Sequence, residues 1–256
     1  MSTATHATTT TRLLRLRGPS LVRLVLVELR KSLDTRASRW FALGLVLLIV
    51  AAAVYVLTEA GNEGAVAAER VFTTPWALAR MLLPVLGVLS MTSEWSQRTA
   101  LTTFALVPRR GRVLVAKLGA VLVLSVVTVL LVGAVAVTVA VVAGLLTGEP
   151  VQWHGLARHV GGALIGGVCF MGLGAALGAL LQQTAVALVA YFVAPTFVSV
   201  VGATLVDDLV KWISPIVAIG RLEDLDLDGS AAPTVVALVL WIVLPLSVGT
   251  VRWLRR

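Results

Sequence analysis

The segment between Ser93 and Arg110 has the most distinctive spacing of charged and apolar residues in the sequence. Glu94 precedes Arg98 by four residues, which is the favourable order for an ion pair on one helix face. Pro108 cannot continue a helix, so the segment should bend there. Three apolar residues between these points share a helix face: Leu101, Phe104 and Ala105. The pattern predicts a short amphipathic helix that is held under the membrane by a rigid bend.

Three arginines follow the predicted bend: Arg109, Arg110 and Arg112. Each basic residue near an anionic membrane surface contributes about 1 kcal/mol of attraction. An ordinary interfacial loop helix would show the same pattern, so the residues alone leave both interpretations open.

Motifs for covalent chemistry are missing from the sequence. It contains no GxxxxGK[ST] phosphate loop, no GxGxxG after a strand and no HExxH. His6, His154 and His159 have no acidic or cysteine partner at ligand spacing, and Cys169 is the single cysteine. We therefore expect no catalytic residues, no metal site and no cofactor.

The composition indicates a membrane protein. Of the 256 residues, 58% are hydrophobic and 13% are charged, whereas soluble domains carry about 25% charged residues. Apolar surface on this scale, arranged in long uncharged runs, cannot be hidden in one soluble domain. A soluble globular enzyme is excluded, and an all-α polytopic fold is expected.

A spanning helix needs about 20 predominantly apolar residues. The uncharged run between Val160 and Val206 is too long for one span, and the Gln182–Gln183 pair is its natural turn. We predict six spans, at about residues 40–58, 76–92, 118–147, 160–181, 184–204 and 232–251.

The charges between these spans are sorted by side. The segments on the side of the termini hold 16 of the 21 Lys and Arg residues, and the opposite loops hold 10 of the 13 acids. The positive-inside rule then places both termini in the cytoplasm, in a multi-pass protein of the inner (plasma) membrane. This sorting accounts for the net charge of +8, so no nucleic acid partner is expected.

Residues 1–18 are expected to form a disordered cytoplasmic tail, and residues 19–256 a single transmembrane domain. From about Pro19 to Arg36, one helix face carries apolar residues while Arg23, Arg30 and Lys31 lie elsewhere; the apolar residues are Leu21, Val25, Leu29 and Leu33. An interfacial helix requires this pattern. A peripheral anchor with no partner would show it too.

The order Glu94, Arg98-Thr99, an apolar helix, Pro108-Arg109 and Lys117 resembles the family of ABC transporter type-2 permeases. The lead-in helix, six spans and cytoplasmic link extend the resemblance over nearly the whole chain. The sequence departs from the family pattern at Ala100, at Ser96-Gln97 and in the absence of a serine before Arg109.

The resemblance implies a permease subunit of an ATP-driven exporter, working as a homo- or heterodimer in the lipid bilayer with a separate nucleotide-binding ATPase subunit. The lead-in helix would also touch that ATPase. A membrane anchor or assembly factor without transport activity is the alternative. The residues implied in ATPase coupling are Glu94, Arg98, Thr99, Leu101, Phe104, Pro108 and Arg109.

Features inside the membrane are open to two interpretations each. The GxxxG pairs Gly162/Gly166 and Gly174/Gly178 allow close helix approach, either within one chain or at a dimer seam. Arg80, expected about one turn inside the outer end of the second span, either contacts an anionic substrate along the path (or pairs across a dimer) or anchors beside Trp76.

Two features near the last spans complete the sequence pattern. Pro195 suggests a kink in the fifth span. Residues 207–221 resemble the re-entrant outer hairpin of the permease family, and the acidic run at 223–228 is expected to be a solvated loop, with calcium ligation the other interpretation.

Overall fold

A bilayer offers the backbone no hydrogen-bond partner but itself, so apolar runs of this length form helices. The computed structural model describes residues 19–34, 36–60, 66–96, 110–205 and 207–255. The helices are α1 (Leu21–Asp34), α2 (Arg36–Ala60), α3 (Ala68–Ser96), α5 (Arg110–Thr147), α6 (Leu156–Leu181), α7 (Thr184–Leu205), α8 (Asp207–Ile213), α9 (Pro215–Glu223), α10 (Ala231–Leu238) and α11 (Leu244–Arg255). A π-helical turn, Val239–Val243, joins α10 to α11.

Six helical segments in the described part of the chain are long and apolar enough to cross a membrane. The predicted all-α polytopic fold with six spans is confirmed at that level. A small parallel pair, β1 (Val66–Ala67) with β2 (Val151–Gln152), is the exception to purely helical structure in the described residues. The spans are Ser38–Thr58, Ala68–Trp95, Gly111–Thr147, Leu156–Leu181, Thr184–Gly202 and Ala231–Arg255.

The turn predicted at Gln182–Gln183 is confirmed, because α6 ends at Leu181 and Gln182 adopts a left-handed φ of 54°. Two helices begin well before the predicted span starts. The helix α3 begins at Ala68 rather than near residue 76, and α5 begins at Arg110 rather than near residue 118. Charged residues near the predicted span limits, such as Arg80 and Lys117, therefore lie inside continuous helices.

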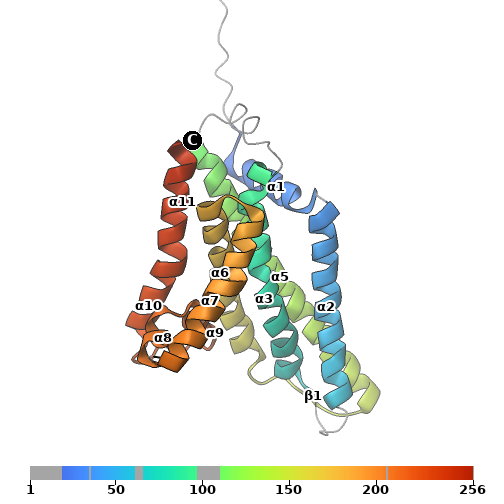
Figure 1. The fold of residues 1–256 in the computed structure, drawn as a ribbon. Helices are drawn as coiled ribbons and strands as arrows, with labels where there is room; N and C mark the ends of the chain where they lie inside the picture. The colour runs from blue at the N-terminus through green and yellow to red at the C-terminus, as the bar shows by residue number, and fades with distance from the viewer. Residues whose placement is uncertain (1–18, 35, 61–65, 97–109, 206, 256) are drawn as a thin grey trace, which may run out of the picture.

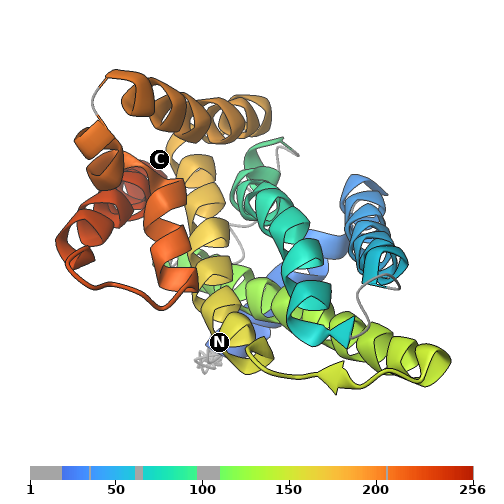
Figure 2. The ribbon, with the colours of Figure 1, turned by 90° about the horizontal axis from the view of Figure 1, so that it is seen from below.

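The helix α1 lies across one end of the bundle, at the same end as the C-terminus, while α8 and α9 lie at the opposite end (Figure 1). The helix α6 runs through the middle, with α3 and α5 on one side and α9 on the other (Figure 2). Within its apolar window 61% of α6 is buried, against 17% for α7. The core is therefore built around α6, and α7 faces outward.

Glycines let α6 approach its neighbours. A Cβ at Gly174 would lie 2.0 Å from the carbonyl oxygen of Pro84 in α3, and one at Gly178 would lie 3.1 Å from the Cα of Val88. The glycines of the other GxxxG pair, Gly162 and Gly166, lie against Glu223 at the end of α9. Both motifs are thus used for packing within one chain, as the simpler of the two interpretations expected.

The short helices α8 and α9 connect α7 to α10, and this segment is hydrogen-bonded to α7 and to the π-helical turn that follows α10. The hydroxyls of Ser199 and Ser214 lie 2.9 Å apart, and Trp241 Nε1 donates to the carbonyl of Ile213 at 2.7 Å. Pro195 lies inside α7, which is continuous through it. The predicted tail at residues 1–18 lies outside the described residues.

Candidate functional site

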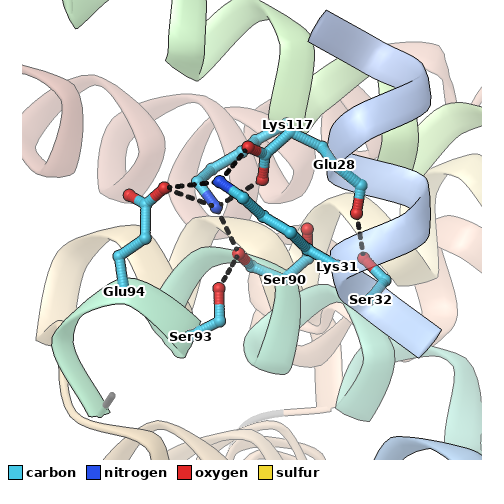
Figure 3. Close-up of polar contacts among 7 residues, drawn as sticks. All are labelled: Glu28, Lys31, Ser32, Ser90, Ser93, Glu94 and Lys117. Atoms are coloured by element: carbon cyan, nitrogen blue, oxygen red, sulfur yellow. Dashed lines mark hydrogen bonds and ion pairs between the residues drawn. The ribbon is translucent and has the colours of Figure 1, made fainter. Parts of the chain in front are cut away.

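Four charged side chains meet where α1 crosses the ends of α3 and α5 (Figure 3). Glu28 and Lys31 come from α1, Glu94 from the last turn of α3, and Lys117 from the second turn of α5. We call these four residues the charge cluster.

Lys117 occupies the centre of the charge cluster and is fully buried. Its ammonium donates to Glu28 Oε2 at 2.8 Å and to the backbone carbonyl of Ser90 at 3.0 Å, and it lies 3.6 Å from Glu94 Oε1. An unpaired ammonium at this depth would be strongly unfavourable, so these contacts are a condition for burying it.

Glu28 bridges the two lysines. Its Oε1 accepts from Lys31 Nζ at 2.8 Å while its Oε2 accepts from Lys117, and its side chain is 7% exposed. Lys31 also reaches Glu94 Oε1 at 3.5 Å and remains 40% exposed. The charge cluster therefore joins three helices through two acids and two bases.

The charge cluster shifts the pKa values of its two residues on α1, Glu28 and Lys31. Burial by itself raises the pKa of Glu28, but the ammoniums of Lys117 and Lys31 outweigh it and hold that pKa below the usual 4.5. For Lys31, burial lowers the pKa, while Glu28 and Glu94 outweigh it and the net pKa lies above 10.5. Both groups on α1 are thus stabilised in their charged forms.

Glu94 was predicted to couple to a partner and to pair with Arg98. The structure turns its carboxylate inward, 3% exposed, toward Lys31 and Lys117. Its second oxygen, Oε2, is buried with no hydrogen-bond partner among the described residues. The remaining predicted coupling residues lie outside the described residues: Arg98, Thr99, Leu101, Phe104, Pro108 and Arg109.

The charge cluster joins the two helices that border residues 97–109. Glu94 lies three residues before that segment, and Lys117 lies eight residues after its end. Since Glu94 and Lys117 are in contact, the flanks of α3 and α5 are fixed to each other and to α1. A force applied at this segment would reach all three helices together.

Sequence reasoning found Glu94 and Lys117 but not Glu28, and it placed Lys31 only on the polar face of the lead-in helix. The sequence did allow the Glu28–Lys31 contact to be predicted, because the two residues are three positions apart and can form an ion pair on a helix. Their insertion under α3 and α5 could not be predicted, because it depends on how α1 crosses the bundle.

Arg80 lies well inside α3. Counting from Ala68, it is 12 residues into α3, or about 18 Å along the helix. The helix α3 continues outward past Trp76, so Arg80 is further from the helix start than from the predicted start of the span, and its depth in the membrane stays a prediction. Its Nη1 donates to Glu223 Oε2, and its guanidinium carbon lies 5.9 Å from the centre of the Phe170 ring.

The described residues show no candidate metal site, and the groove beside α2 has no charged lining residue. Among the described residues, no group of three or more His, Cys, Asp and Glu side chains could hold a metal ion. A groove of about 620 Å³ between α2 and α3 is lined by uncharged residues: Leu48, Ala51, Ala52, Tyr55, Thr73, Thr74, Ala77 and Leu78. Among the ion pairs shown for the described residues, those with a largely buried acid side chain are in the charge cluster and in the Arg80–Glu223 pair.

No protein-family model matches this chain, and no curated protein is significantly similar to it in sequence. The function of the chain must therefore be inferred from its residues, its fold and its two charged sites.

Proposed function

We propose that this chain is the transmembrane subunit of an ATP-driven exporter of the ABC type-2 permease kind. It would form the substrate path together with a second permease subunit, identical or related. A separate nucleotide-binding subunit would hydrolyse ATP, and this chain would catalyse no covalent reaction.

The charge cluster is the observation that carries this proposal. A permease must pass the movement of its ATPase from a cytoplasmic segment to its spanning helices. Glu94 and Lys117 fix the two helices that border the predicted coupling segment, and Glu28 adds α1 to the same unit. Breaking such buried ion pairs is costly, so the three helices would move as one body.

The proposed orientation places α1 and the C-terminus in the cytoplasm, across the inner membrane. Its support is the excess of Lys and Arg in the segments on that side. The helices α8 and α9 would then cap the outer end of the path as a re-entrant hairpin. Their hydrogen bonds to α7 and to the π-helical turn Val239–Val243 support a unit that is held in place without spanning the bilayer.

Mild detergent extraction of a tagged copy from its native host, followed by mass spectrometry, tests the proposal. We expect a soluble ATPase with a phosphate loop to co-purify in near-equal amount. Leu101→Asp should abolish its recovery while leaving membrane insertion intact. The matched control is Leu227→Asp, because Leu227 is an exposed leucine in the opposite loop and should have no effect.

Glu94→Ala tests coupling rather than docking. Since the Glu94 carboxylate is buried against lysines, its removal should leave the ATPase bound and hydrolysing ATP while export falls. If no ATPase co-purifies under mild conditions, the chain is better explained as a membrane anchor or assembly factor.

A further inference from the structure

Arg80 lies in a spanning helix, but its ion-pair partner Glu223 lies in a short helix that does not span. Glu223 is the last residue of α9, which lies between two spans, whereas Arg80 lies within α3. Glu223 Oε1 also accepts from Trp76 Nε1 at 2.9 Å. The packing of the short segment α8–α9 against α3 therefore places the Glu223 carboxylate beside Arg80.

The side chains of Arg80 and Glu223 differ in how much of their surface is exposed. The side chain of Arg80 is 37% exposed, whereas that of Glu223 is 9% exposed. Among the described residues Glu223 uses one N–H of Arg80, and a guanidinium carries five. The remaining donors leave Arg80 able to meet a second acceptor from the exposed side.

The position of Arg80 near the middle of α3 makes its counter-ion necessary. An unpaired arginine within a spanning helix is strongly unfavourable, so it is almost always paired or turned toward water. If α9 moved away, Arg80 would need another anion. In a bilayer, that anion would arrive on an amphiphile.

Glu223 is suited to being exchanged. Burial raises its pKa, Arg80 and the Trp76 N–H oppose this, and Asp224 adds to it, so the net pKa of Glu223 lies above its usual value. The groups that face it are Arg80 and Trp76 from α3, Cys169 from α6 and Asp224 beside it. The neutral form of Glu223 is thus more accessible than that of an ordinary glutamate.

We propose that Arg80 is a binding site for the anionic group of a membrane amphiphile, which it holds in exchange for Glu223. The apolar body of the ligand would lie among the surrounding helices, and the Phe170 ring would border its charged end. As a statement about transported substrate, this rests on the function proposed above; as a statement about binding, it does not.

The test uses the purified full-length chain in phosphatidylcholine nanodiscs, with no ATPase present. The probe is a single-chain alkyl sulfonate with a diazirine near the sulfonate, and the comparison probe is the alcohol of the same length. Photolabelling of peptides that contain Arg80 or Phe170 is measured against probe concentration.

Substitution of Arg80 and substitution of Glu223 should change sulfonate labelling in opposite directions. Arg80→Gln should reduce sulfonate labelling to the level of the alcohol. Glu223→Gln keeps one acceptor oxygen but removes the competing charge, so it should lower the half-saturating concentration about fivefold. Arg80→Lys should retain labelling, which keeps the test usable if Arg80→Gln does not fold.

Arg252→Gln is the matched control. Arg252 is an exposed arginine in α11 that donates to the backbone carbonyl of Leu180 at 3.0 Å and, among the described residues, touches neither α9 nor Arg80, so its loss should not change labelling. Labelling that survives Arg80→Gln, or an affinity that Glu223→Gln does not raise, would overturn the proposal. Displacement by millimolar methanesulfonate would also overturn it, because the site would then recognise a free anion.

The outcome is separable from that of the proposed function. If the sulfonate binds as expected but no ATPase co-purifies, Arg80 remains an amphiphile site in a protein that is not a permease. If the ATPase co-purifies and the sulfonate does not bind, only the exchange site is lost.

Discussion

Replacing Lys117 by methionine keeps an unbranched side chain but removes the ammonium at the centre of the charge cluster. Glu28 and Glu94 would then be buried with Lys31 alone, and Lys31 is half-exposed. Removing one member of a buried ion pair costs about 3–5 kcal/mol. We expect the unfolding temperature of the protein in detergent to fall by about 10 °C.

The matched control for this prediction is Lys31→Met. Lys31 meets the same two acids but keeps 40% of its side chain exposed, so its loss should lower the unfolding temperature by much less. Equal effects of the two substitutions would contradict the central position that the structure gives to Lys117.

The ionisation of Glu28 gives the charge cluster a pH dependence. Because its folded-state pKa lies below 4.5, the charged carboxylate stabilises the fold above about pH 4.5, and this contribution disappears as the pH falls through the folded value. The groups that face it are Lys31 on α1 and Lys117 on α5, and Glu94 contacts the same two lysines.

Glu28→Gln is the variant that isolates this effect. At pH 7 it should unfold at a lower temperature than the parent, and the difference should shrink as the pH is lowered from 5 to 3.5. Lys31 contributes no change in this range, since its pKa lies above 10.5. A difference that stays constant across the range would show that Glu28 does not act through its charge.

At the scale of elements, the contact between α3 and α6 depends on glycine. Gly174→Ala would place a methyl group 2.0 Å from the Pro84 carbonyl oxygen, which neither backbone can accept without shifting. Overpacking of this kind costs typically about 1–3 kcal/mol. We expect a lower unfolding temperature, measured in detergent by tryptophan fluorescence.

Gly161→Ala is the corresponding control on the same helix. A Cβ at Gly161 meets nothing within 4 Å, and alanine has the higher helix propensity, so the unfolding temperature should stay equal or rise. If both substitutions had the same effect, close packing at Gly174 would not be what holds α3 against α6.

The sequence predicted the elements better than their ends. The turn at Gln182–Gln183 was identifiable because two polar residues interrupt an uncharged run too long for one span. The starts of α3 and α5 were placed too late, because Arg80 and Lys117 were interpreted as limits of the uncharged runs. A charge can lie inside a helix when a partner neutralises it, and sequence spacing does not show partners that are distant in the chain.

The same limit applies to the two charged sites. Glu94 and Lys117 could be identified from their order along the chain, whereas Glu28 lies 89 residues from Lys117 and Glu223 lies 143 residues from Arg80. These pairings form only when α1 and α9 pack against the spans. Helix periodicity predicts which face of each helix is apolar, but not which helix that face meets.

At the scale of the whole molecule, the orientation in the membrane can be measured with single cysteines. In a Cys169→Ala background, Arg255→Cys marks the end of the molecule at which α1 and the C-terminus lie, and Asp228→Cys marks the opposite end. Both positions are exposed. A membrane-impermeant thiol reagent then reports which of them faces outward.

With both termini in the cytoplasm, intact cells should be labelled at Asp228→Cys, and Arg255→Cys should be labelled only after permeabilisation. The physical reason is the charge asymmetry: 16 of the 21 Lys and Arg residues lie on the side of Arg255, and retaining them in the cytoplasm is favoured during insertion. The reversed pattern would put the charge cluster outside the cell, where no cytoplasmic ATPase could act on it. The proposed coupling would then fail, whereas exchange at Arg80 would remain open, because it requires only the bilayer.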